Sequence, residues 1–219
     1  MASKRPLMEI GGWEAFVHGV FAIAITLLVL DIKVPAVETY GTSEQLIHAL
    51  TTDNFPRYVA YVLGFAFLGT YWIATHRSIR MLRGVDHWGL VIGLVYLMFV
   101  SVVPFVTALL AEYIGTDNGR DQVALVVFTG WQLLLSVAAV VSLIWAVRGE
   151  RLIKHELAGP ALDRWVRIAM LGPVIWLVAL ASAIFLSGTI TVILMAVIVI
   201  IFLQEAPPFG SPEVSSDGS

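Results

Sequence analysis

The chain has 219 residues, of which 58% are hydrophobic and 13% charged, and its net charge is −3. A soluble domain carries charge on about a quarter of its residues, so a water-facing globule of this size is excluded. The absence of cysteine from the sequence excludes disulfides, thiolate metal sites and cysteine nucleophiles. The acidic balance argues against nucleic-acid binding. Together with a mean hydropathy of +0.87, this composition indicates a membrane protein.

The uncharged runs of the sequence predict an all-α, polytopic membrane protein with six transmembrane helices. A crossing needs about 20 mostly apolar residues, and we expect helices at roughly residues 12–34, 57–76, 88–112, 122–147, 166–186 and 189–204. The last two share one uncharged run, residues 168–203. That run is too long for a single crossing, and Ser187-Gly188-Thr189 supplies a turn in its middle. Residues 1–205 would form one transmembrane domain, and residues 206–219 a disordered cytoplasmic tail.

The basic residues predict the orientation of these helices. Ten of the thirteen Lys and Arg residues fall on one side of the predicted spans, and that side should be cytoplasmic. Both termini would then lie inside the cell, with the chain a multi-pass protein of the plasma membrane. On the outer side, Thr42-Ser43-Glu44-Gln45 has the spacing of a capping box and predicts a short surface helix before the second span.

The first predicted helix carries two neighbouring stripes. One consists of small residues, Ala15, Gly19, Ala22 and Thr26, and the other of apolar residues, Phe16, Ile23, Leu27, Leu30 and Val34. Small residues let another helix approach closely, so the apolar stripe could face a symmetry axis. The alternative is that it faces lipid or the bundle core. We interpret the segment as a retained helix and not a cleaved signal peptide, because Asp31 and Lys33 stand where small residues would be needed.

Three segments of the sequence resemble a known family. The first is Gly19–Pro35, which reads GVFAIAITLLVLDIKVP. The second has Tyr71-Trp72 followed by His76-Arg77 and Arg80, and the third has Phe99-Val100 followed by Pro104-Phe105 and Thr107-Ala108-Leu109-Leu110. In this order they resemble the first three spans of the endosomal/lysosomal potassium channel family, specifically its bacterial branch, over roughly residues 13–115.

The resemblance implies a potassium channel that conducts passively, needs no cofactor and is not an enzyme. Subunits of this family form a homotetramer of six-span chains or a dimer of doubled ones, and the first span lines a pore without a carbonyl-ring filter. Carried over to this chain, Ile23 would be the hydrophobic constriction, or gate, and Thr26 a hydroxyl ring that favours potassium. Leu27 and Leu30 would add further apolar layers. On an α-helical wheel these four residues fall within an arc of about 100°.

Four positions depart from the family pattern. The family usually begins its first span with Arg-x-x-x-Phe-Ser-Asp, of which only Phe16 is kept here. The other positions hold Gly12, Val17 and His18, and Gly93 takes the place of the usual Asn in the third span. Because buried polar partners tend to be satisfied or lost as a set, we expect the polar network that joins the first three spans to be absent or rebuilt.

Further polar candidates lie at the two ends of the first helix. Asp31 sits near the outer mouth, where four carboxylates would attract cations, although an interfacial ion pair with Lys33 is the simpler interpretation. His18 should face the second span, within reach of Trp72 or His76. There it would either make the protein sensitive to mild acid, since histidine changes charge near neutral pH, or be an ordinary hydrogen-bonded residue.

The remaining ionisable residues predict no metal site and no catalytic site. Two functions other than a channel stay open. The spacing of His48, His87 and His155 is not that of a metal site, so we expect no bound metal, and Glu112, Asp117 and Asp121 are expected to be solvated in an outer loop. A proton- or sodium-coupled transporter would usually bury ionisable residues at mid-membrane, and the predicted spans hold none there. A structural membrane subunit without transport activity is the other alternative.

Overall fold

The computed structural model describes residues 9–35, 41–116, 119–148, 152–154 and 160–204. Within these residues the chain is an all-α bundle, as predicted, with five helices long and apolar enough to cross a membrane and a sixth, shorter one. The helices are α1 Ile10–Leu27, α2 Ser43–His48, α3 Phe55–Met81, α4 His87–Tyr113, α5 Arg120–Val147, α6 Pro160–Phe185 and α7 Gly188–Gln204. The predicted tail, residues 206–219, lies outside the described residues.

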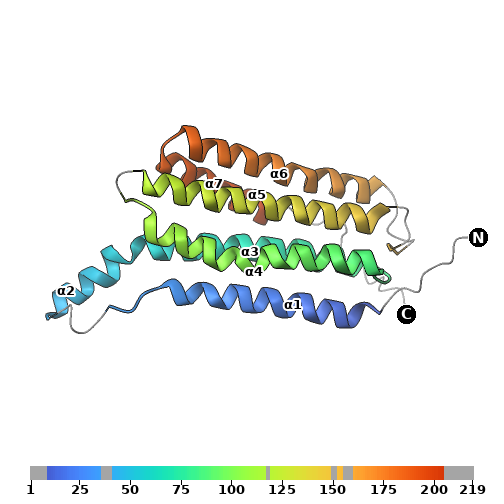
Figure 1. Ribbon diagram of the computed structural model, residues 1–219, viewed down its shortest axis with the longest axis horizontal. Coiled ribbons are helices and arrows are strands. Elements are labelled where there is room, and N and C mark those ends of the chain that lie inside the picture. The colour runs from blue at the N-terminus through green and yellow to red at the C-terminus, as the bar shows by residue number, and fades with distance from the viewer. Residues whose placement is uncertain (1–8, 36–40, 117–118, 149–151, 155–159, 205–219) are drawn as a thin grey trace, which may run out of the picture.

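The long helices run up and down in a bundle that leaves α1 at one edge (Figure 1). Helix α1 packs against α3 and α4, while α5 lies between α4 and α6. Helix α7 contacts α3, α5 and α6. One side of α1 is therefore covered by the rest of the chain, and the position of α1 at the edge leaves its other side uncovered.

Aromatic side chains occupy the centre of the larger apolar core. Phe67 of α3, Phe128 of α5 and Trp176 of α6 are each at most 1% exposed. The ring centroid of Phe67 lies 4.8 Å from that of Trp176 and 6.1 Å from that of Phe128, which is within the range of favourable aromatic pairs. These contacts join α3, α5 and α6 into the body against which the edge helix is placed.

A glycine permits the close approach of α1, α3 and α4. A Cβ atom at Gly64 of α3 would lie 2.8 Å from Thr107 Cγ2 and 3.2 Å from Leu28 Cδ2. Thr107 and Leu28 are themselves buried, so neither can move aside without disturbing its own packing. The three helices thus meet at a position where only a residue without a side chain fits.

The short outer helix follows the predicted capping pattern. Thr42 Oγ1 accepts a hydrogen bond from the Gln45 backbone N–H at 3.3 Å, and Gln45 Oε1 accepts one from the Gly41 N–H at 3.0 Å. These bonds satisfy donors that the first turn of a helix leaves free. Helix α2 then continues into one π-helical turn, Ala49–Asp53, that leads to α3.

The expected spans agree with the helices in order, but several ends differ. Helix α1 ends at Leu27 and continues as a 3₁₀ turn to Asp31, short of the expected residue 34, and α3 runs to Met81, beyond the expected residue 76. The long apolar run breaks at Leu186 and Ser187, one residue before the expected turn, to give α6 and α7. Helix α6 begins at Pro160, earlier than expected, because proline fits the first helical turn and the polar residues after it can extend the helix beyond the hydrocarbon core. Helix α7 has 17 residues, or about 26 Å, slightly short of a full crossing.

Two linkers pair with each other at the end of the bundle where α3 ends and α4 begins. The Arg83 N–H donates to the Leu152 carbonyl at 2.8 Å, and the Lys154 N–H donates to the Met81 carbonyl at 3.0 Å. The result is a single antiparallel bridge between Leu82 and Ile153. It attaches the chain between α5 and α6 to the end of α3.

Candidate functional site

Helix α1 has one face packed into the bundle. Val17, Phe21, Ala24 and Leu28 are each at most 2% exposed, and together they form part of the second apolar core, with residues of α3, α4 and α5. Their spacing of three and four residues is that of a single helical face. This face fixes the rotation of α1 about its own axis.

The opposite face of α1 carries both stripes that the sequence singled out. In the single chain the exposed fractions are 62% for Ile23, 42% for Leu27 and 73% for Leu30, and Thr26 is also exposed. A Cβ atom placed on Gly19 would have no neighbour within 4 Å, so the backbone is accessible there too. The four predicted pore residues therefore share one side of the helix, which is free to meet lipid or another subunit.

The outer end of α1 is wound more tightly than the helical wheel assumed. Residues Leu28–Asp31 form a 3₁₀ turn, which has three residues per turn where an α-helix has 3.6. Each step around the axis is then about 120° instead of 100°, which rotates Leu30 by roughly 60° relative to its α-helical position. Ile23, Thr26 and Leu27 keep the predicted relation to each other, and the rotation brings Leu30 directly above Leu27, because side chains three residues apart eclipse in a 3₁₀ turn. All four residues therefore stay within the predicted arc.

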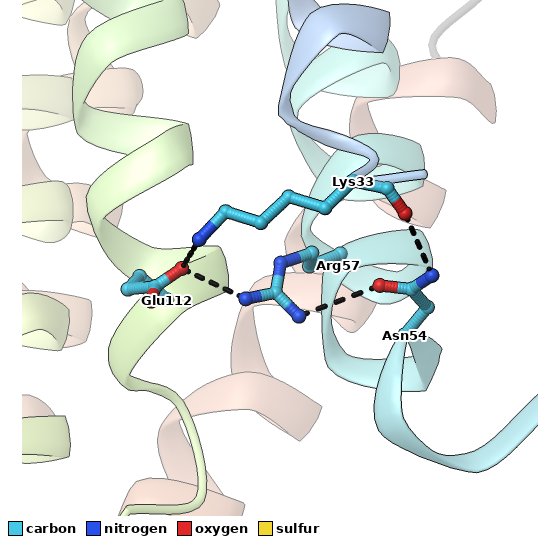
Figure 2. A network of polar contacts seen from close by, with 4 residues as sticks. All are labelled: Lys33, Asn54, Arg57 and Glu112. Carbon is cyan, nitrogen blue, oxygen red and sulfur yellow. Dashed lines mark hydrogen bonds and ion pairs between the residues drawn. The ribbon is translucent and has the colours of Figure 1, made fainter. Parts of the chain in front are cut away.

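A network of charged groups holds the C-terminal end of α1, which the sequence predicts to be its outer end (Figure 2). Lys33 Nζ lies 2.6 Å from Glu112 Oε2 of α4, and Arg57 of α3 donates to the same oxygen at 2.8 Å. The Asn54 side chain donates to the Lys33 carbonyl at 2.9 Å and accepts from Arg57 at 3.4 Å. Three segments thus meet at one carboxylate, and the ion pair that Lys33 forms here is with Glu112.

The sequence interpretation also misjudged Glu112. It is not solvated in a loop but lies in the last turn of α4, where its carboxylate accepts from two cations. Hydropathy could not reveal this, because the partners come from α3 and from the segment after α1. Asp121 lies in the first turn of α5, and Asp117 lies outside the described residues.

Three aromatic rings meet at the inner end of α1, the end where α3 terminates. His18 Nε2 lies 3.3 Å from His76 Nδ1. The Trp72 ring stacks on His76 at a centroid distance of 5.6 Å and lies 6.0 Å from His18. The structure thus brings together the three residues singled out at this end, and their role remains a prediction.

Sequence reasoning missed a fourth member of this group. Glu14 lies one turn before His18, and its Oε1 is 3.8 Å from His76 Nδ1. The donor atoms of Glu14, His18 and His76 all lie within 4.8 Å of one another. The spacing of four residues between Glu14 and His18, which puts both on one helical face, was the signal that could have found it.

The contacts between the first three spans are rebuilt where the family pattern is lost. A Cβ atom on Gly93 of α4 would collide with the indole ring of Trp13, which occupies the space that an asparagine side chain would need. Between α3 and α4, the Thr75 and Tyr96 hydroxyl groups are 2.9 Å apart. The contact of Trp13 with Gly93 thus joins α1 to α4, and the hydroxyl pair of Thr75 and Tyr96 joins α3 to α4. The contact of His18 with His76 joins α1 to α3.

The surroundings of Val17 and Gly12 suit the residues that stand there in place of the family motif. Val17 is 2% exposed and belongs to the packed face of α1, where an apolar side chain is favourable without a polar partner. Gly12 is exposed, and a Cβ atom there would meet nothing within 4 Å. Neither position leaves a buried polar group without a partner.

The fold and the one-sided first helix define the class of this protein, a polytopic helical membrane protein. Comparison with known proteins then gives the family. The sequence profile described as "Endosomal/lysosomal potassium channel TMEM175" matches residues 13–104. A potassium channel from Chamaesiphon minutus is 37% identical over 199 residues, which covers 89% of this chain and 93% of that protein. This chain belongs to the TMEM175 family of potassium channels.

Two further relatives agree with this assignment. A potassium channel from Streptomyces collinus is 44% identical over 118 residues, or 54% of this chain and 55% of its own length. The crystal structure of a lysosomal potassium-selective channel TMEM175 homolog from Chamaesiphon minutus superposes with a TM-score of 0.77 at 34% identity, covering 89% of this chain and 96% of that one. The family consists of membrane-embedded potassium channels, so the assignment places this chain among channels and not among enzymes.

Proposed function

We propose that the chain conducts potassium passively through a pore lined by the open face of α1 from four copies of the subunit. The observation that carries this proposal is the one-sided packing of α1. Its buried face is complete within one chain, whereas Ile23, Thr26 and Leu27 project from the bundle. A helix at the edge of the bundle, with small residues beside an apolar stripe, can approach three copies of itself around an axis.

Ile23 would form the narrowest ring of this pore. Four isoleucine side chains around an axis offer no oxygen atom to replace the hydration shell of an ion, so a narrow ring would gate by excluding water. Leu27, one turn further, would extend the apolar section. Because the 3₁₀ turn brings Leu30 directly above Leu27, we expect Leu30 to continue the apolar lining one turn further out.

Thr26 would supply the selectivity of the pore. Its hydroxyl group donates to the Ile23 carbonyl within the helix at 2.9 Å, which leaves the lone pairs of the oxygen free to contact a cation. A partly dehydrated sodium ion loses more hydration energy than potassium does, so a weak oxygen ring favours potassium. Asp31, partly exposed at the outer end of α1, would raise the local concentration of cations.

The charge pattern supports passive transport and an orientation. The central turns of the described helices carry no Asp, Glu, Lys or Arg, whereas coupled transporters usually place such residues there. Arg77, Arg80 and Lys154 lie at the same end of the bundle, beside the paired linkers. By the positive-inside rule this end faces the cytoplasm, so both termini would be cytoplasmic, in the plasma membrane.

The test is ion flux in liposomes reconstituted with the purified protein. Ile23→Asn should raise potassium flux several-fold because a polar ring lets water fill the constriction, whereas Ile23→Leu should change it little. The matched control is Ile193→Asn on α7, where the side chain is 59% exposed but far from the proposed pore face. Unchanged flux in folded, tetrameric Ile23→Asn would contradict the proposal and leave this face to lipid.

Thr26 provides a second, independent readout. Thr26→Val keeps the shape of the side chain but removes its oxygen, so the ratio of potassium to sodium flux should fall, while Thr26→Ser should retain most of it. An unchanged ratio in Thr26→Val would contradict the assigned role of the hydroxyl group. Proton movement in fixed proportion to potassium would instead show a coupled transporter.

A further inference from the structure

Glu14, His18 and His76 form a compact group of potential metal ligands. Glu14 and His18 lie one turn apart on α1, and His76 lies near the end of α3. The shortest separation is 3.3 Å, between His18 Nε2 and His76 Nδ1, and Glu14 Oε1 is 3.8 Å from the same Nδ1 atom. All three donor atoms lie within 4.8 Å of one another.

The separation of the two histidine nitrogens matches that of two ligands in a tetrahedral metal site, and Glu14 lies slightly further away. At Zn–N distances of about 2.0–2.1 Å, two nitrogen ligands of a tetrahedral ion are about 3.3–3.4 Å apart. The two histidine nitrogens already have this spacing, and Glu14 needs only a small change of rotamer to complete the third position. Three protein ligands leave a fourth position for water, which is the usual arrangement of an open zinc site.

The surroundings favour a transition metal over magnesium or calcium. The group offers two imidazoles and one carboxylate, and imidazole nitrogen prefers zinc, copper, nickel or cobalt. Magnesium and calcium instead need several oxygen ligands. Arg80 and Lys154 line the same open cleft as Glu14 and His76. Their positive charge works against a cation held by charge alone, so only an ion that bonds strongly to imidazole overcomes it.

The packing around the group limits the freedom of the two histidine rings. Trp72 stacks on the His76 ring with an interplanar angle of 17° and also contacts the His18 ring. Ordered rings cost less entropy on binding, because their rotamers are already restricted. The side chains of Glu14 and His76 are nevertheless 31% and 33% exposed, so an ion from solution can reach them.

We propose that Glu14, His18 and His76 form a binding site for a transition-metal dication such as Zn²⁺, which fastens the inner end of α1 to α3. Without the ion, the same two rings share the hydrogen bond that their distance allows. The inference does not depend on the proposed pore, because binding is measured without ion flux.

The test uses the full-length, untagged protein in detergent. Bound metal is first removed with a chelator, and the protein is then titrated with zinc in a calorimeter. We expect one Zn²⁺ per chain, a higher thermal unfolding midpoint with zinc, and no comparable effect of Mg²⁺. His18→Gln and His76→Gln should each weaken binding more than tenfold. The matched controls are His87→Gln and Glu9→Gln, at exposed positions outside the group, and both should bind as the parent does.

A cysteine substitution keeps the proposal testable if a glutamine variant misfolds. His76 faces the other ligands with Nδ1, the ring nitrogen nearer the backbone, so the sulfur in His76→Cys can take a similar position. Because the parent chain has no cysteine, Co²⁺ bound to this variant should give a thiolate charge-transfer band absent from the parent. No zinc binding by the parent, or equal binding in parent and His18→Gln, would overturn the proposal, as would a Co²⁺ complex of His76→Cys without that band.

Discussion

The two ends of α1 are attached to the bundle by different chemistry. At the outer end Lys33 and Arg57 share the Glu112 carboxylate, so the contact is between groups that are charged at any ordinary pH. At the inner end Glu14, His18 and His76 form a group whose cohesion depends on what it binds. The outer attachment therefore persists over the ordinary pH range and is weakened by salt, whereas the inner one depends on whether an ion is bound. In the proposed pore, α1 would in this way be fixed at one end and adjusted at the other.

Between these ends, α1 is held by the packing of its buried face. Loss of that packing should lower the free energy of unfolding more than a change at either end. Phe21 is fully buried against α4, with its ring centroid 6.3 Å from that of Tyr96. Phe21→Ala should destabilise the protein by about 3 kcal/mol, because the cavity loses contacts that the neighbours cannot restore. Thermal unfolding in detergent measures this, with Phe105→Ala as control, since Phe105 is 65% exposed. Equal effects of the two substitutions would show that α1 is held by its ends alone.

The next largest effect should come from the shared carboxylate of the outer end. Glu112→Gln keeps an acceptor oxygen but removes the negative charge that the two cations share, and Arg57, whose side chain is only 18% exposed, has little access to water as a substitute. We expect a loss of about 1–2 kcal/mol. The control is Glu44→Gln on α2, where the carboxylate is exposed. If thermal unfolding of Glu112→Gln matches the control, the network in Figure 2 contributes nothing measurable to stability.

The smallest effect should come from Lys33, the more exposed of the two cations. The Lys33 side chain is 62% exposed, so Lys33→Met should cost less than about 1 kcal/mol. Arg57→Met should cost more, since Arg57 also donates to Asn54. Because salt screens exposed charges, the cost of Lys33→Met should nearly vanish in 1 M KCl. A larger loss for Lys33→Met than for Arg57→Met would reverse the assigned ranking.

Most of the fold could be predicted from the sequence, because a bilayer imposes helices of known length. The turn near Ser187 followed from the length of the apolar run, and the cap of α2 followed from Thr42 and Gln45, whose bonds are local. The early start of α6 was missed, since hydropathy reports the apolar part of a helix and not its polar extension at Pro160.

The candidate site was predictable where helical periodicity fixes the direction of a side chain, as for His18, which meets Trp72 and His76 of α3 as expected. The two neighbouring stripes, one with Thr26 and the other with Ile23 and Leu27, follow from helical periodicity, although the 3₁₀ turn that rotates Leu30 has no signal in that pattern. Glu112 was misjudged because its two partners come from elsewhere in the chain, and charge in a loop looks the same whether it is paired or solvated. The pairing of Glu14 with His76 was missed for the same reason.

The bridge between Leu82 and Ile153 should tolerate amino-acid substitutions better than deletions in this part of the chain. Its bonds join backbone atoms, so they do not require particular side chains. Leu152 and Ile153 are 3% and 2% exposed, and exchanges among apolar residues there conserve both the bonds and the burial. Deletion of one of these two residues instead draws Lys154, now exposed, into a place where an apolar side chain is buried. Relatives of this protein should therefore vary in residue identity within this linker more readily than in the register of its pairing.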